Sequence, residues 1–153
     1  SLELSKLHNL PAYVTLQPEY NLYDREGFEK ELEPLCLQHG VGVIGYYSLA
    51  SGFLSGKYRS QADLGKSVRG AGIGKKYLNE RGLAILKALD SVAAAQNTTP
   101  AAIALAWLIQ RKSVTAPIVS ATSVEQLNEI LQAVKIELTS DQVKQLDEAS
   151  RWK

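Results

Sequence analysis

A glycine-rich segment with two tyrosines and a lysine, residues 45–57, holds the residue types of this sequence best suited to bind a ligand. It reads Gly-Tyr-Tyr-Ser-Leu-Ala-Ser-Gly-Phe-Leu-Ser-Gly-Lys and directly follows the apolar run 41–44. The carboxyl end of a buried strand is where parallel sheets and barrels bind ligands. Aromatic rings offer a flat face, small residues let the backbone approach a phosphate, and Lys57 supplies a cation. The segment therefore predicts a nucleotide-type cofactor site.

The elements that must position this segment alternate between strands and helices. Alternating or continuous apolar patterns predict strands at 12–17, 41–46 and 115–120, the second buried on both faces. Helical patterns with caps predict helices at 27–38, 80–96, 100–109, 123–133 and 139–150. Thr99-Pro100 opens the third of these helices, and capping boxes at 123–126 and 139–142 open the last two.

Residues 51–79 form a long connection rich in Gly, Ser, Lys and Arg. Such a length is unusual for an idle loop in a compact domain, so we expect either an active-site lid or a disordered segment. By contrast, the charged run Asp24-Arg25-Glu26 is expected to be a solvated loop.

Strands that alternate with helices imply parallel pairing through right-handed crossovers. Three parallel strands leave unpaired backbone at both edges of the sheet, so further strands must come from elsewhere. Residues 1–10 resemble the tail of a helix, and the chain contains no methionine. We therefore expect one domain, residues 1–153, that is part of a longer (β/α)8 barrel.

Composition excludes several classes of function. The formal net charge of +1 gives no electrostatic reason to expect nucleic acid or a membrane as partner. No apolar run approaches the roughly 20 residues that span a bilayer, and no signal segment is recognisable, so a cytoplasmic protein is expected. One cysteine, Cys36, cannot form an internal disulfide, and with two histidines no metal site is expected.

Three ordered motifs resemble the aldo-keto reductase family: Gln-Pro-Glu-Tyr-Asn-Leu at 17–22, the segment 46–58, and Ala-Thr-Ser-Val-Glu-Gln-Leu at 121–127. The resemblance spans the whole chain and is strongest to bacterial members and to the potassium-channel β-subunit branch. It implies an α/β fold, the C-terminal part (strands six to eight with their helices) of a (β/α)8 TIM barrel. It also implies an NADP(H)-dependent oxidoreductase that interconverts carbonyls and alcohols.

The resemblance also implies cofactor-binding roles. Gln17 matches the glutamine that binds the nicotinamide carboxamide, and Tyr46 matches the aromatic residue that stacks on the nicotinamide ring. Arg69 matches a lid arginine that reaches the 2′-phosphate. The pyrophosphate loop is matched by Tyr47, Ser48, Leu49, Ala50, Ser51 and Gly52 with Lys57, and the positions around the adenosine by Ser120, Thr122, Gln126 and Glu129.

Several positions depart from the family pattern. Gly45 stands where relatives often carry proline, Tyr47 where many carry serine, and Ile130 where an asparagine is common. Because Ser120 and Gln126 replace a lysine and an arginine, that preference rests mainly on Lys57 and Arg69.

Simpler structural readings stay open for these residues. Tyr46 could be a rim aromatic and Gln17 a strand-end polar residue. Lys57 and Arg69 could belong to a solvated basic surface, while Gln126 and Glu129 could serve only the helix start and its exposed face.

The family's catalytic tyrosine, lysine, aspartate and histidine lie on early strands that this sequence does not contain. We therefore expect no catalytic residue here and no activity from the chain alone, with the N-terminal half of the barrel as its partner. Two other functions remain possible: an NADPH-binding regulatory subunit, and an inactive half-barrel fragment.

Overall fold

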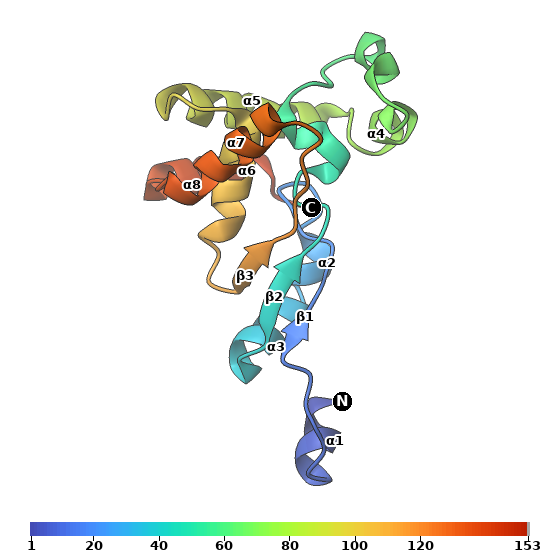
Figure 1. The fold of residues 1–153 in the computed structure, drawn as a ribbon, viewed down its shortest axis with the longest axis vertical. Coiled ribbons are helices and arrows are strands. Elements are labelled where there is room, and N and C mark those ends of the chain that lie inside the picture. The colour runs from blue at the N-terminus through green and yellow to red at the C-terminus, as the bar shows by residue number, and fades with distance from the viewer. Residues whose placement is uncertain (153) are drawn as a thin grey trace.

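A parallel three-stranded sheet forms the centre of the computed structural model, which describes residues 1–152 (Figure 1). The strands are β1 (Thr15–Leu16), β2 (Gly42–Gly45) and β3 (Val114–Pro117), in the order β1-β2-β3. Both pairings are parallel, and the register of β2 against β3 shifts between Val43 and Ile44. The expected α/β class with a parallel sheet is confirmed.

The strands are shorter than predicted, and β2 is not buried on both faces. Val43 and Gly45 are buried, whereas Gly42 and Ile44 on the other face are only half-buried. The prediction of a strand covered on both faces is therefore wrong for this chain, because its helices cover one face of the sheet only.

Four helices lie where the sequence predicts them: α5 (Glu80–Ala95), α6 (Pro100–Ile109), α7 (Val124–Gln132) and α8 (Ser140–Ala149). The Thr99 side chain caps α6 by accepting from the Ala102 N–H, and the Thr139–Gln142 capping box is present at α8. Helix α6 is apolar nearly all round, and residues 101–108 are buried against the sheet and the other helices. It is the central element of the core.

The helix expected at 27–38 is two helices, α2 (Glu26–Glu29) and α3 (Leu32–His39). The cause is Pro34, which has no N–H to donate and whose ring would clash with the carbonyl of Lys30 in a continuous helix. Proline is tolerated in the first turn, so α3 begins just before it. Cys36 of α3 is buried, and burial together with the nearby Glu33 carboxylate raises the pKa of its thiol.

The long connection at 51–79 is not an unstructured loop. It contains the 3-10 helices η1 (Ala50–Ser55) and η2 (Gln61–Lys66) and the α-helix α4 (Gly70–Lys76). Tyr58, Ile73 and Tyr77 anchor it in the core, where each is almost fully buried. The disordered alternative is therefore wrong, because these apolar side chains bury enough surface to order the segment.

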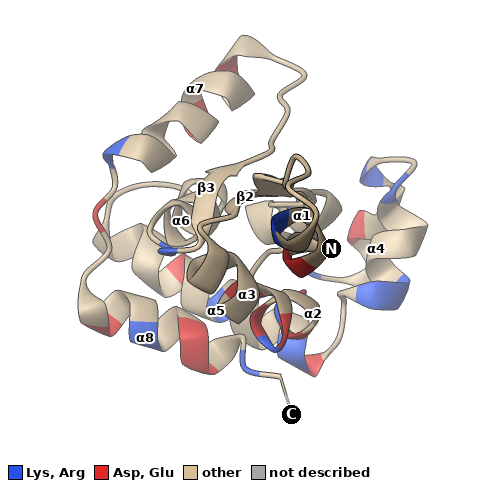
Figure 2. Cartoon of the chain, turned by 90° about the horizontal axis from the view of Figure 1, so that it is seen from below, with Lys and Arg blue, Asp and Glu red and all other residues tan. Residues whose placement is uncertain are grey.

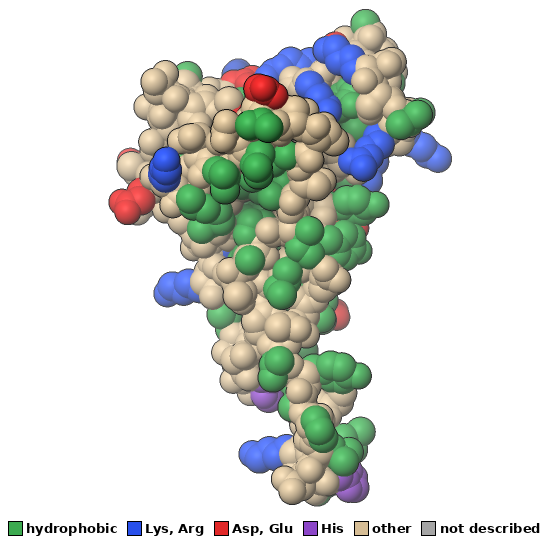
Figure 3. Space-filling model, viewed as in Figure 1, with side chains coloured by type: hydrophobic (Ala, Val, Ile, Leu, Met, Phe, Trp, Pro, Cys, Tyr) green, Lys and Arg blue, Asp and Glu red, His purple; other side chains and the backbone are tan. Residues whose placement is uncertain are grey.

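Helix α1 (Leu2–Leu7) lies apart from the other helices, at the far end of the sheet (Figure 1). Apolar side chains are exposed along one side of the molecule, from α1 past β1 and the ends of β2 and β3 to α7 (Figure 3). The exposed large apolar residues on and beside these elements are Leu4 and Leu7 of α1, Tyr13 and Val14 before β1, Ile118 after β3, Val124, Leu127 and Leu131 of α7, and Val134 after it.

Across the described residues, no single helix has the length and apolar character to cross a membrane; only the pair α5 and α6, bent by 93°, does so together.

Candidate functional site

The carboxyl ends of the three strands meet at one edge of the sheet, as the predicted site requires. The Tyr46 N–H donates to the Pro18 carbonyl (2.9 Å), and the Tyr20 N–H donates to the Tyr46 carbonyl (3.3 Å). On the other side, the Ile118 N–H donates to the Gly45 carbonyl (2.8 Å). The segments that follow β1, β2 and β3 are therefore joined by backbone hydrogen bonds.

Tyr46 and Tyr47 form an aromatic turn directly after β2. Their ring centroids are 5.2 Å apart, and the side chains are 39% and 54% exposed. Ser48 is buried, and its Oγ donates to the Ile118 carbonyl (2.8 Å), which fixes the turn to the end of β3. The turn thus presents two aromatic faces on a rigid backbone.

The backbone of this turn adopts left-handed conformations that side chains disfavour. Tyr47, Ala50 and Ser51 have φ values of 55°, 48° and 58°, and Gly52 follows at 96°. Left-handed non-glycine residues cost on the order of 1–3 kcal/mol each and persist where surrounding contacts hold them. Such conformations concentrate at binding sites, which favours a functional role for residues 47–52.

Lys57 lies over the same backbone. A β-carbon on Gly52 would stand 3.3 Å from Lys57 Cε and 3.4 Å from Nζ, so the glycine leaves room for the ammonium group. The structure therefore brings together the small-residue segment and the cation that the sequence analysis assigned to a phosphate. Leu49 is half-buried and Ala50 is buried, so these two contribute backbone rather than side chains.

Gln17 follows β1 at the same edge, and its side chain is exposed. On the other side of the edge, Ser120 and Thr122 lie on the segment from β3 to α7, while Gln126 and Glu129 lie on α7. Ser120, Thr122 and Gln126 are exposed, and Glu129 is half-buried. Arg69 is exposed at the start of α4. Within residues 1–152, no hydrogen bond or ion pair joins Arg69, Ser120 or Glu129 to the aromatic turn.

The capping box predicted at 123–126 is only half formed. Ser123 Oγ accepts from the Gln126 N–H (3.2 Å), as expected. Gln126 Oε1, however, accepts from the N–H and the Oγ1 of Thr122, each at 3.0 Å, instead of from Ser123. The threonine hydroxyl competes for the amide oxygen, so Thr122 and Gln126 form one hydrogen-bonded unit.

Sequence reasoning missed a polar cluster that joins α4 to the segment after β1. Lys76 Nζ lies 2.8 Å from Glu19 Oε1 and 3.0 Å from Asp24 Oδ1. Burial lowers the pKa of Lys76, but its hydrogen bonds to both carboxylates outweigh burial and raise it overall. Burial raises the pKa of Tyr77, whose hydroxyl donates to Asp24 Oδ2 (3.0 Å). Pairs this far apart in sequence leave no local signal.

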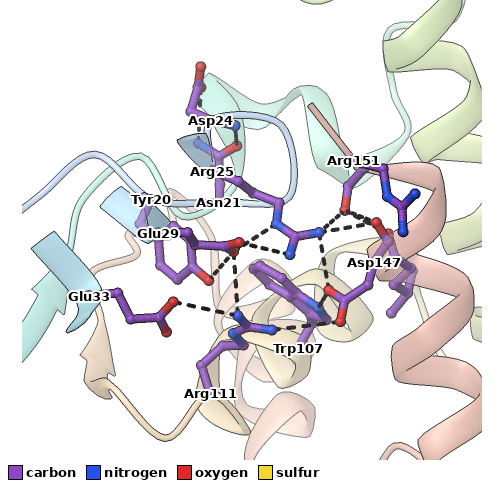
Figure 4. Close-up of polar contacts among 12 residues, drawn as sticks. Tyr20, Asn21, Asp24, Arg25, Glu29, Glu33, Trp107, Arg111, Asp147 and Arg151 are labelled. Carbon is purple, nitrogen blue, oxygen red and sulfur yellow. Dashed lines mark hydrogen bonds and ion pairs between the residues drawn. The ribbon is translucent and has the colours of Figure 1, made fainter. Parts of the chain in front are cut away.

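It also missed a buried ion-pair network centred on Arg25, which is only 6% exposed (Figure 4). The Arg25 guanidinium binds both carboxylate oxygens of Glu29 (2.7 and 3.0 Å), and Nη1 lies 3.1 Å from Asp147 Oδ1. Arg25 also packs 5.1 Å from the Trp107 ring and 5.2 Å from the Trp152 ring. The expectation of a solvated loop at 24–26 is wrong, because partners on α2 and α8 enclose this side chain.

Around this network the remaining groups are also paired. Tyr20 Oη donates to Glu29 Oε1 (2.7 Å), and burial raises the pKa of the phenol, which keeps it a neutral donor. Trp107 Nε1 donates to Asp147 Oδ1 (3.0 Å). We assign this cluster a structural role, since it links α2, α6 and α8.

A hollow of about 870 Å³ lies beside α8 and not at the strand ends. It is open to solvent and lined by apolar side chains and charges of both signs, among them Leu138, Lys144 and Glu148. A lining of this mixed character matches no particular class of ligand, so the strand-end edge is the candidate site.

The fold and this edge define a parallel α/β protein of the kind that binds ligands at the carboxyl ends of its strands. A model of the Aldo/keto reductase family matches residues 2–151, and the chain belongs to that family.

Several curated proteins are similar to the chain. The L-glyceraldehyde 3-phosphate reductase of Escherichia coli (strain K12) is 31% identical over 155 residues, covering 96% of this chain and 44% of that protein. The Probable voltage-gated potassium channel subunit beta of Arabidopsis thaliana is 35% identical over 133 residues, covering 84% of this chain and 40% of that protein. Among such relatives, the chain spans between 38 and 44% of their length.

Proposed function

We propose that this chain is the C-terminal, cofactor-binding part of an aldo-keto reductase that uses NADP(H) to interconvert carbonyls and alcohols. The observation that carries the proposal is the exposed aromatic turn on left-handed backbone at the strand ends, with Lys57 beside Gly52. The residues present suit a dinucleotide: flat aromatic faces, an exposed amide, approachable backbone and a cation.

Each residue of the edge then has a role. The Tyr46 face stacks against the nicotinamide ring, and the Gln17 amide binds its carboxamide. Residues 47–52 line the pyrophosphate, and Lys57 offsets its charge. NADPH, when bound, supplies the hydride; the chain's part is to fix the face of the ring that meets the substrate.

The remaining candidates lie around the adenosine end. Ser120, Thr122, Gln126 and Glu129 form its proposed binding surface at the start of α7, and residues 51–79 form the lid. Arg69 on that lid contacts the 2′-phosphate, for which a guanidinium is well shaped.

A binding titration tests the cofactor assignment. In the full-length protein, Lys57→Met and Arg69→Met should each weaken NADPH binding about tenfold, the scale of one charge-assisted hydrogen bond. For Arg69→Met, NADH affinity should hardly change, because that cofactor lacks the 2′-phosphate. Lys87→Met, an exposed lysine on α5, is the control. Equal losses for both cofactors in Arg69→Met would contradict the role of Arg69.

The catalytic groups of the family belong to the part of the protein outside this chain. The isolated chain should therefore reduce no carbonyl above a protein-free control, whereas the full-length protein should. The exposed apolar side of the molecule is then the surface that the N-terminal half of the barrel covers (Figure 3).

A second function is supported by the relative named as a potassium channel subunit beta. In that case, the barrel binds NADPH and regulates a partner protein, and catalysis is incidental. Single-turnover hydride transfer separates the two: a regulatory subunit should oxidise bound NADPH negligibly with every aldehyde tried, whereas a reductase should do so rapidly.

A further inference from the structure

Helix α4 is docked onto the segment after β1 through its last turn. Lys76 bridges Glu19 and Asp24, and its ammonium lies 5.0 Å from the centre of the Tyr77 ring. The Tyr77 hydroxyl donates to the other oxygen of Asp24 (3.0 Å). Both contacts of α4 therefore converge on one carboxylate.

From Asp24 the hydrogen bonds continue through Asn21, which is completely buried. Asn21 Oδ1 accepts from the backbone N–H groups of Tyr23 (2.8 Å) and Asp24 (2.9 Å). Its Nδ2 donates to Asp24 Oδ2 (3.2 Å) and to the Tyr47 carbonyl (3.0 Å). The amide is used in full, so it cannot shift without breaking one of these bonds.

The carbonyl that Asn21 holds belongs to the first left-handed residue of the aromatic turn. The second arm of the Lys76 contact ends on Glu19, which lies in parallel register with Tyr46. The contacts that dock α4 are therefore connected to both tyrosines. Glu19 connects them to Tyr46, with which it pairs in parallel register, and Asn21 connects them to the carbonyl of Tyr47.

We propose that Asn21 and Asp24 are positioning residues, through which the docking of α4 by Lys76 and Tyr77 sets the geometry of the Tyr46–Tyr47 turn. Because a left-handed turn needs external contacts to persist, it should relax when α4 is undocked. The value of this coupling for cofactor binding rests on the proposed function, whereas the coupling itself does not.

Amide hydrogen exchange in the full-length protein, without cofactor, tests the coupling. Lys76→Met should make the amides of residues 46–52 exchange roughly threefold faster, on the scale of one partly exposed ion pair, with little change in the urea midpoint. Lys75→Met, one residue away and exposed, is the matched control and should leave these amides unchanged. Lys76→Arg should restore the protection.

Asp24→Asn and the double variant with Lys76→Met complete the test. Each single variant should increase the amide exchange rate of residues 46–52. The rate in the double variant should be close to that of the faster single variant, because both substitutions remove the same Lys76–Asp24 contact. Unchanged exchange at 46–52 in both single variants, or additive effects, would overturn the coupling.

A parallel NADPH titration separates the coupling from the proposed function. The Kd should rise about threefold in Lys76→Met and not in Lys75→Met. Faster exchange with no NADPH binding to the unmodified protein would refute the cofactor assignment and leave the coupling standing.

Discussion

Arg25 illustrates how far a single residue can depart from its local pattern. A charged loop residue became a buried side chain because Asp147 and Ser150, more than 120 positions away, lie within hydrogen-bonding distance. Removing one partner of a buried ion pair leaves uncompensated charge, which is costly.

The guanidinium shape matters as much as its charge. Lysine cannot bind both Glu29 oxygens at once and also reach α8, so Arg25→Lys should lower the free energy of unfolding by about 3 kcal/mol. Arg59→Lys, which alters a bidentate pair with Asp90 that is nearly half exposed, should cost less than about 1 kcal/mol. If urea unfolding showed equal losses of unfolding free energy in Arg25→Lys and Arg59→Lys, the burial of Arg25 would not explain its contribution.

Residue-scale prediction from sequence succeeded where the partner is local. Thr99 and Thr139 cap the helices expected of them, because a cap needs only the next three residues. It missed Asn21 and Lys76, each of which has a partner in another element. At Gln126 two local partners compete, and the amide oxygen accepts from Thr122 instead of completing the capping box with Ser123.

At the scale of elements, close approach explains the segment 51–79. A β-carbon on Gly70 would lie 1.7 Å from the carbonyl oxygen of Leu64, so α4 can pack on η2 only with glycine at this position. Gly72, in the same helix, has open space around it.

Alanine substitutions in α4 should therefore have opposite signs. Gly72→Ala should stabilise α4 by about 0.5–1 kcal/mol, because alanine restricts the unfolded chain and favours helix. Gly70→Ala should destabilise the docked segment by about 1–3 kcal/mol through the forced separation of α4 from η2. Exchange protection of residues 60–77 is the measurement; protection gained in Gly70→Ala would contradict this packing.

Helix α7 has no buried residue and carries an exposed apolar stripe that includes Val124, Leu127 and Leu131. Leu127→Glu should leave the unfolding of the isolated chain nearly unchanged. In the full-length protein it should cost about 2 kcal/mol if the rest of the barrel covers the stripe. Asn128→Glu, on the next exposed position, is the control. If Leu127→Glu left the unfolding free energy of the full-length protein unchanged, the apolar stripe of α7 would be solvent-exposed there as well.

Element positions were largely predictable, since hydrophobic period and caps are local. The break at Pro34 was available from the sequence but was outweighed by the surrounding helical pattern. The half-exposed face of β2 could not be predicted. An apolar strand has the same sequence pattern whether the elements that pack on its second face lie in this chain or outside it.

For the whole molecule, the three-stranded sheet exposes apolar side chains and both of its edges among the described residues. Charged side chains lie on other elements: α8 carries Asp141, Lys144, Asp147 and Glu148, and α4 carries Lys75 and Lys76 (Figure 2).

The isolated chain should therefore self-associate. Sedimentation velocity over a concentration series should show species larger than 16.7 kDa, whereas the full-length protein should not associate through this face. If the isolated chain were a soluble monomer of native-like stability, the exposed apolar surface would not require another protein surface to pack on it.

Cys36 gives the chain a practical property. It is the only cysteine of the sequence, it is buried, and its raised thiol pKa keeps the reactive thiolate scarce. The chain also lacks methionine. A cysteine introduced in place of Lys75 would thus be the only readily labelled thiol of these 153 residues, and a fluorophore there would report the movement of α4 without any prior removal of native sulfur groups.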